Sequence, residues 1–124
     1  MSAEKNGIAQ PNKKKINSRQ KGARFERAVL SWLAARTGER GRRTSDGYNQ
    51  SSRGDIDHPA LAAYNVECKH REKVAINDWI EQSEADAAAD REPIVIWRTN
   101  KRGPYVNMKL EHFLDLLLGE EDAA

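Results

Sequence analysis

The stretch that decides the fold reads Gly54-Asp55-Ile56-Asp57, then a turn at His58-Pro59, then Tyr64-Asn65-Val66-Glu67-Cys68-Lys69. It predicts two short strands, at about residues 55–57 and 64–70, that the turn joins. Because side chains alternate along a strand, Glu67 and Lys69 point to the same face. The turn brings Asp55 beside Glu67, so that two carboxylates and one ammonium group converge on one spot.

This convergence predicts a metal-dependent phosphodiesterase site. Two carboxylates without a cation repel each other, and a hard divalent ion relieves the repulsion. We expect Asp55 and Glu67 to bind Mg²⁺, or Mn²⁺ in its place, with the backbone carbonyl of Cys68 as a third protein ligand. Lys69 would orient the attacking water or neutralise charge on the phosphate. The alternative is a surface hairpin with an ordinary Glu-x-Lys pair, because the spacing alone is a weak pattern.

Three further residues each allow two interpretations. Asp57 is either a second metal ligand or a charge at the end of the strand, and the second interpretation is preferred. Glu26 lies beside the apolar stripe of the first helix, where a carboxylate is usually solvated, but it could reach the metal site as an outer carboxylate. Gln82, on the helix after Lys69, is favoured as a surface residue; otherwise it hydrogen-bonds the nucleophile or a metal-bound water.

Charge is distributed unevenly along the chain. Residues 1–43 carry a net charge of +9 and residues 44–124 carry −7, which leaves a total of +2. The asymmetry predicts a basic arm that contacts a polyanion, with a solubilising tail as the alternative. Lys101 and Arg102 are candidate contacts to DNA phosphates. Arg40, Arg42 and Arg43 are better candidates, because they directly precede the metal site. Lys21, Arg24 and Arg27 on the first helix could also hold phosphates.

Length and composition limit the other function classes. A chain of 124 residues, 38% of them apolar, forms at most one domain with a small core. Cys68 is the only cysteine, which excludes an intrachain disulfide and favours a reducing, cytoplasmic setting. We expect no membrane span and no signal peptide. No histidine or cysteine spacing fits zinc, and no Gly-rich phosphate loop indicates a nucleotide-driven motor.

Hydrophobic periodicity and turn residues predict the order α-β-β-β-α-β-β-α, which is an α/β sandwich. We expect a disordered basic arm over residues 1–17, one folded domain over residues 18–119 and a frayed tail over residues 120–124. Ser18 is the expected N-cap of the first helix, and Asn77 or Asp78 that of the second. The expected helices and strands cover residues 18–36, 42–45, 55–57, 64–70, 77–89, 93–97, 105–108 and 110–118.

Several motifs, taken together, resemble those of the PD-(D/E)XK nuclease superfamily. They lie at residues 21–30, 54–57 and 66–69. Within the superfamily, the KGxxxER helix resembles that of the Holliday junction resolvases of archaea and, more closely, of their small phage-encoded relatives. The helix at residues 79–87 and the segment at residues 94–105 are also similar to the phage group. The resemblance covers most of the chain.

The resemblance implies a restriction-endonuclease-like sandwich, in which a mixed β-sheet of about five strands is flanked by helices. It implies that Asp55 and Glu67 are metal ligands and that Lys69 is the catalytic lysine. Glu26 becomes the acidic residue carried by the helix.

The resemblance also implies how the protein acts on DNA. Enzymes of this kind are homodimers that cut two strands of a branched DNA symmetrically and leave 5′-phosphates. A serine in the loop before the metal-binding aspartate is often functional there, and Ser51 or Ser52 is its counterpart. A phage origin would place the protein in the cytoplasm of a bacterial host.

Two residues depart from the pattern of the superfamily. Gly54 stands in place of the usual proline, which the superfamily tolerates, and Asp57 is polar where an apolar residue is usual, which leaves its role open. The leading hypothesis is a Mg²⁺-dependent endodeoxyribonuclease that resolves four-way DNA junctions. The alternatives are a structure-nonspecific nickase, a repair or restriction nuclease, and a catalytically idle DNA-binding module of the same fold.

Overall fold

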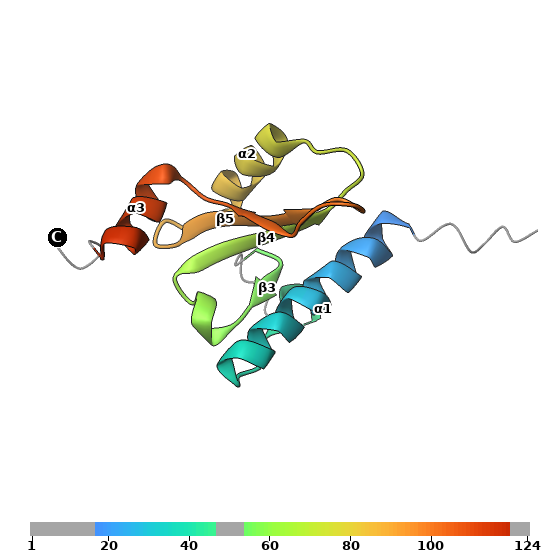
Figure 1. Cartoon of the computed structure of the whole chain (residues 1–124), viewed down its shortest axis with the longest axis horizontal. Coiled ribbons are helices and arrows are strands. Elements are labelled where there is room, and N and C mark those ends of the chain that lie inside the picture. Colours follow the sequence, from blue (N-terminus) through green and yellow to red (C-terminus); the bar gives the residue numbers. More distant parts are fainter. Residues whose placement is uncertain (1–16, 47–53, 120–124) are drawn as a thin grey trace, which may run out of the picture.

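A computed structural model describes residues 17–46 and 54–119. The loop with Ser51 and Ser52, the predicted tail and all but the last residue of the predicted arm lie outside the described residues. The order of the described helices and strands agrees with the predicted order. Figure 1 shows how these elements are arranged.

Helix α1 (Ser18–Thr37) begins and ends at residues that favour helix caps. Asn17 is the N-cap, and its side-chain oxygen accepts a hydrogen bond from the backbone N–H of Gln20 at 2.8 Å. The prediction that Ser18 is the N-cap is therefore wrong by one residue. Gly38 ends the helix in the left-handed conformation, with φ of 77°, which glycine adopts without strain.

Strands β2 (Arg42–Arg43) and β3 (Ile56–Asp57) form a short antiparallel pair. Strand β2 is shorter than the predicted strand over residues 42–45, because Thr44–Asp46 turns into a 3-10 helix, η2. A second 3-10 helix, η3 (Pro59–Leu61), forms the predicted turn after β3.

The larger sheet has the strand order β4-β5-β6. Strand β4 (Tyr64–His70) pairs in parallel with β5 (Glu92–Arg98), and β5 pairs antiparallel with β6 (Tyr105–Asn107). A parallel bridge between Gly54 and Val66 connects the β2-β3 pair to this sheet. The predicted mixed arrangement of five strands is confirmed, although the strands are divided between a two-stranded and a three-stranded sheet.

Helix α2 (Ile76–Asp86) begins after Ala75 without a side-chain cap. The prediction of an N-cap at Asn77 or Asp78 is therefore wrong. Both residues lie in the first turn instead, where the carboxylate of Asp78 stabilises the helix N-terminus electrostatically. The helix ends at Asp86, three residues earlier than predicted.

Helices α1 and α2 cover opposite faces of the larger sheet, so the predicted α/β sandwich is confirmed (Figure 1). Alternation along β4 directs Val66 and Cys68 to the α1 side and Glu67 and Lys69 to the α2 side. The core lies between α1 and the sheet, and its buried residues are Phe25, Val29, Ile56, Val66, Cys68 and Ile94.

Helix α3 (Leu110–Leu118) has the predicted bounds and ends at Gly119, which has φ of 68°. It stands at one end of the molecule, at the left in Figure 1. Across residues 17–46 and 54–119, none of the helices combines the length and the apolar character needed to cross a membrane.

Gly54→Ala should destabilise the protein, because Gly54 has φ of 80° and an added Cβ would collide with the backbone of Val66. We expect the free energy of unfolding to fall by about 2–4 kcal/mol, since left-handed strain and a backbone clash add. Urea unfolding followed by circular dichroism measures this. The matched control is Gly22→Ala in α1, where a Cβ meets open space and the stability should rise by about 0.5–1 kcal/mol. Equal stability of the Gly54→Ala protein and the wild type would contradict the described backbone path.

Candidate active site

Asp55 lies where the chain of β3 separates from β4. Its backbone N–H donates to the carbonyl of Val66 at 2.7 Å, as in a parallel sheet, but its own carbonyl accepts from the N–H of Thr44 at 3.0 Å. The next N–H of β4 on this edge, that of Cys68, donates to the side chain of Asp55 instead, with 2.8 Å to Oδ2. One carboxylate oxygen is thus fixed by the sheet.

Glu67 and Lys69 lie on one face of β4, as strand alternation requires. Glu67 is only 3% exposed and neighbours Val95 of β5. The Nζ of Lys69 donates to Oε1 of Gln82 on α2 at 2.9 Å. Gln82 is exposed, as favoured from the sequence, and its side chain also holds the ammonium group of the candidate catalytic lysine.

Helix α2 runs antiparallel to β4, so that successive turns of the helix follow alternate residues of the strand. One turn of helix advances about 5.4 Å and two strand residues about 6.6 Å. Gln82 lies against Lys69, and Asp86, one turn later, brings its negative charge near Asp55 and Glu67, where it raises both pKa values. Asp86 was not singled out from the sequence, although its i+4 spacing from Gln82 was a usable signal.

Glu26 joins the site from α1. Its Oε1 accepts a hydrogen bond from the Nε of Arg43 at 2.7 Å, and both side chains are largely buried. Arg43 also contacts Asp46 at 3.2 Å. Burial raises the pKa of Glu26, the hydrogen bond from Arg43 opposes this, and the negative charge of Asp55 raises the pKa further. Glu26 therefore lies within electrostatic range of Asp55.

Burial and neighbouring negative charges hold the two central carboxyl groups above their usual pKa values. Burial raises the pKa of Asp55, against the hydrogen bond from Cys68 and the charge of Lys69. Burial also raises the pKa of Glu67, and the charges of Asp55 and Asp86 bring it to about 7. A cation between the carboxylates would relieve this repulsion.

The backbone of Cys68, and not its thiol, contributes to the site. The thiol is buried, and burial together with the nearby carboxylates raises its pKa, so that it is not a reactive thiolate. The N–H of Cys68 points to Asp55. Because the N–H and C=O of one strand residue point to the same edge, the carbonyl of Cys68 faces this edge as well.

The donors at this edge suit a hard ion that keeps part of its water shell. In the described part of the chain, no three His, Cys, Asp or Glu side chains gather into a metal-binding cluster. The carboxylates of Asp55 and Glu67 and the carbonyl of Cys68 form an all-oxygen set. Mg²⁺ is typically bound by one or two carboxylates and retains several waters, so this set fits it.

Asn65 is a buried polar residue that was not predicted from the sequence. It lies two residues before Glu67 on the same face of β4, is fully buried, and is close enough to lower the pKa of Glu67. Its amide makes no hydrogen bond of good geometry with the other described residues. A buried amide without partners is costly, so Asn65 is a polar group that the described packing leaves unsatisfied.

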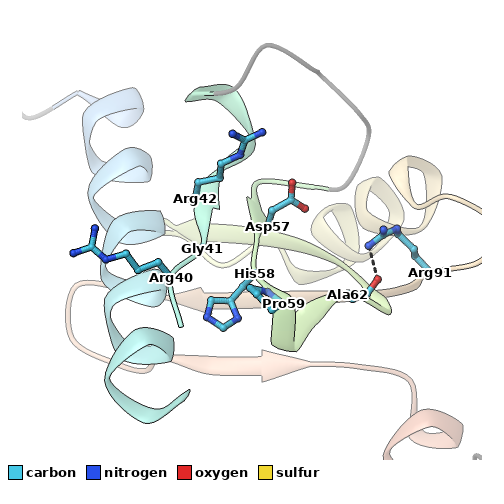
Figure 2. Close-up of a pocket in the computed structure, with 8 residues that line it drawn as sticks. All are labelled: Arg40, Gly41, Arg42, Asp57, His58, Pro59, Ala62 and Arg91. Atoms are coloured by element: carbon cyan, nitrogen blue, oxygen red, sulfur yellow. Dashed lines mark hydrogen bonds between the residues drawn. The ribbon is translucent and has the colours of Figure 1, made fainter. Parts of the chain in front are cut away.

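Asp57, Arg40 and Arg42 lie apart from the carboxylate cluster, around a separate hollow of about 380 Å³ (Figure 2). Asp57 is directly opposite Arg42 in the pairing of β2 and β3. Arg91 also lines this hollow, but its Nη1 donates to the carbonyl of Ala62 at 2.6 Å. This position of Asp57 agrees with the preferred interpretation, a charge at the end of a strand.

A second hollow, of about 510 Å³, gathers four arginines from α1 and β2: Arg19, Arg24, Arg27 and Arg43. Three of the six main candidates for phosphate contact therefore meet beside the ion pair of Glu26. Lys21 lies elsewhere on α1, toward His70, whose pKa is lowered by burial and also by the charge of Lys21. Ser51 and Ser52 lie outside the described residues.

Comparison with known proteins identifies a family to which this chain is similar. A family model described as "Phage putative PDDEXK endonuclease" matches residues 17–122. None of the curated proteins and none of the solved structures matches the chain. The matched range includes every described helix and strand, so the match rests on the whole fold and not on one motif.

Glu67→Gln should stabilise the metal-free protein above neutral pH. The folded pKa of Glu67 is about 7 and its ordinary value is 4.5, so the folded state binds this proton more tightly. The stabilisation of the folded state by this tighter proton binding is fully present below about pH 4.5. It is lost as the pH rises through about 7. At pH 8 the variant should therefore be more stable than the wild type by about 1–3 kcal/mol.

Urea unfolding in chelator at pH 5, 6.5 and 8 tests this expectation. Glu84→Gln, the same change at an exposed position of α2, is the control and should leave the pH dependence unchanged. A stability difference between the Glu67→Gln protein and the wild type that is equal at pH 5 and pH 8 would contradict the raised pKa.

Proposed function

The chain belongs to the phage PDDEXK endonuclease family, and on this basis we propose that it is a Mg²⁺-dependent endodeoxyribonuclease that resolves four-way DNA junctions by paired symmetric nicks. The nuclease domain is assigned to residues 18–119. The observation that carries the proposal is the meeting of Asp55 and Glu67, whose pKa values are both raised, with Lys69 on the face of Glu67.

Asp55, Glu67 and the backbone carbonyl of Cys68 are the groups that would hold the ion. When bound, Mg²⁺ supplies positive charge that polarises the scissile phosphate and makes water a stronger acid. Mn²⁺ accepts the same oxygen ligands and could replace it. The hydrogen bond from Cys68 to Asp55 keeps the carboxylate in position before any ligand arrives.

Lys69 is the residue that we assign to the nucleophile or the phosphate. Its ammonium group has three donors, and one of them is used by Gln82 at 2.9 Å. The remaining donors can hydrogen-bond a water or a phosphate oxygen and stabilise negative charge that develops in the transition state. Gln82 acts through Lys69, because it fixes the direction of the ammonium group.

Glu26 and Arg43 extend the site toward α1. The Nε and Nη1 of Arg43 are occupied by Glu26 and Asp46, so we assign Arg43 to holding Glu26 and not to a free phosphate contact. Glu26, oriented in this way, is an outer carboxylate that can accept hydrogen bonds from water beside Asp55.

The substrate assignment rests on the arginines beside the site. Arg19, Arg24 and Arg27 line the hollow next to Glu26 and would bind DNA phosphates, which fix register without reading sequence. Junction shape would then supply selectivity. A homodimer would cut two strands related by its two-fold axis. A phage enzyme of this kind would act in the cytoplasm of its bacterial host.

Asp55→Asn should reduce cleavage of a labelled, immobile four-way junction by at least about 100-fold, because it removes a charged ligand and a fixed carboxylate. Cleavage is measured under single-turnover conditions at constant moderate salt, with Mg²⁺ or with chelator. The control is Asp57→Asn, the same chemical change two residues later in the separate hollow, which should remain within about threefold of the wild type.

A linear duplex of equal length is the second substrate. Paired nicks in the junction that need Mg²⁺, with the duplex left intact, would support the whole proposal. Equal cutting of both would retain the nuclease and discard junction specificity. Binding without cutting under any divalent metal would leave only a DNA-binding module, and normal cutting by the Asp55→Asn protein would refute the assigned site.

Replacing both Arg24 and Arg27 by alanine should weaken junction binding and reduce its salt dependence. Each lost phosphate contact lowers the slope of log Kd against log salt by about 0.9, so the pair should remove about 1–2 units. Fluorescence anisotropy in chelator, over a range of salt, measures binding without cleavage. The control is the double alanine variant of Lys101 and Arg102, in the turn between β5 and β6. Equal losses for both pairs would mean that general charge, and not the arginines of α1, directs binding.

A further inference from the structure

Helix α3 presents its apolar side to solvent. Six of its nine residues are leucine or phenylalanine, and their exposed fractions range from 39% to 68%. None of its residues is buried by the described part of the chain. Four of the six lie at i, i+3, i+4 and i+7 spacing and form what we name the apolar stripe: Leu110, Phe113, Leu114 and Leu117.

The side of α3 that faces the protein is its polar side. The Nε2 of His112 and the hydroxyl of Tyr64 are 2.6 Å apart, and the two rings pack edge to face with centroids 5.1 Å apart. His112 and Asp115 are half-buried and lie opposite the apolar stripe around the helix. A surface helix normally directs its apolar stripe to the core, so the reversed orientation indicates that another partner covers the stripe.

Within residues 17–46 and 54–119 no element buries the apolar side of α3. The segments outside the described residues are 1–16, 47–53 and 120–124, and the last of them reads Glu-Glu-Asp-Ala-Ala. Together they contain four large apolar or aromatic residues, which are Met1, Ile8, Ile16 and Tyr48. These four side chains are fewer than the six on the exposed face of α3 and are spread over two polar segments, which favours a cover from a second molecule.

The area of the exposed face matches that of a specific dimer. If a fully exposed large apolar residue has roughly 200 Å², the exposed fractions of the six residues correspond to roughly 650 Å². Stable specific interfaces bury about 600–1,000 Å² on each partner. The six residues together reach this range, whereas the four residues of the apolar stripe alone correspond to roughly 440 Å², so a partner of similar size must also cover Leu116 and Leu118 beside the stripe.

The apolar stripe is also complementary to itself. Two antiparallel copies of α3, related by a two-fold axis between Phe113 and Leu114, bring Leu110 against the partner's Leu117 and Phe113 against the partner's Leu114. An interface of this symmetry needs the same patch on both copies. Of the charged residues of the helix, Glu111 lies beside the stripe and Asp115 opposite it, so no like charges meet on the axis.

We propose that two copies of this chain associate through α3, as an antiparallel helix pair about a two-fold axis. This inference rests on the proposed function, because paired nicks need two active sites. It adds the surface through which two copies would associate. Association is measurable without DNA, so a failure to cleave and a failure to associate are separate results. The N-terminal half of α1, with its arginines, lies away from α3 in Figure 1, so this interface leaves the basic hollow accessible to DNA.

Sedimentation velocity of the full-length protein tests the association. We expect a species of twice the chain mass of 14.0 kDa that dissociates on dilution. Leu117→Glu should raise the dissociation constant of the dimer at least about 100-fold, because it buries a charge in an apolar seam. The control is Val74→Glu, the same charge at another exposed apolar residue outside α3, which should sediment like the wild type. Circular dichroism verifies that both variants are folded.

Disulfide cross-linking tests the register and does not depend on a destabilising variant. A mixture of the Leu110→Cys and Leu117→Cys proteins should form a cross-linked dimer under mild oxidation, and each protein alone should form much less. The wild type is the control, since its single cysteine, Cys68, is buried. A wild type that stays monomeric at tens of micromolar, a dimer that survives Leu117→Glu, or equal cross-linking of either variant with itself would each overturn the proposal, as would binding of the monomer to lipid vesicles through α3.

Discussion

The hydrogen bond from the N–H of Cys68 to Oδ2 of Asp55, at 2.8 Å, is the interaction on which the rest of the site depends. In a continuous parallel sheet that N–H would meet a backbone carbonyl, but the carbonyl of Asp55 is already used by Thr44. The chain therefore leaves β4 directly after the bridge of Gly54 to Val66, and a carboxylate takes the position of a backbone group. This substitution places the carbonyl of Cys68 and a carboxylate at the same edge, so the candidate site coincides with a break in the sheet.

The same geometry makes the carboxylate cluster electrostatically unfavourable when it stands alone. Glu67 is almost completely buried, and Asp55 and Asp86 both add negative charge around it. Lys69 offsets part of that charge, while Arg43 is shared between Glu26 and Asp46. A cluster whose pKa values are raised by burial and by like charges is typical of a functional site. The instability of the cluster on its own and the proposed binding of a cation would therefore have one cause.

Local sequence signals were sufficient to predict the helices and strands, but not the tertiary contacts that their side chains make. The bounds of β4 and α3 were predicted correctly, because apolar periodicity and the flanking glycine are properties of the segment itself. The contact of Gln82 with Lys69 depends on how α2 crosses the sheet, and the pairing of Arg43 with Glu26 depends on where β2 meets α1. These are tertiary facts, which explains why Arg43 was assigned to DNA and Asp86 was not singled out.

Helix α3 illustrates the limit of periodicity most clearly. The spacing of its leucines identifies an apolar stripe, but spacing does not specify which surface covers that stripe. The contact of His112 with Tyr64 reverses the expected orientation and directs the leucines outward. In a chain of 124 residues the core is small: its main cluster has six buried residues, and small domains commonly gain stability by association. Association through the self-complementary stripe would therefore meet two requirements at once. It would enlarge the buried apolar surface, and it would hold two active sites in a fixed relation.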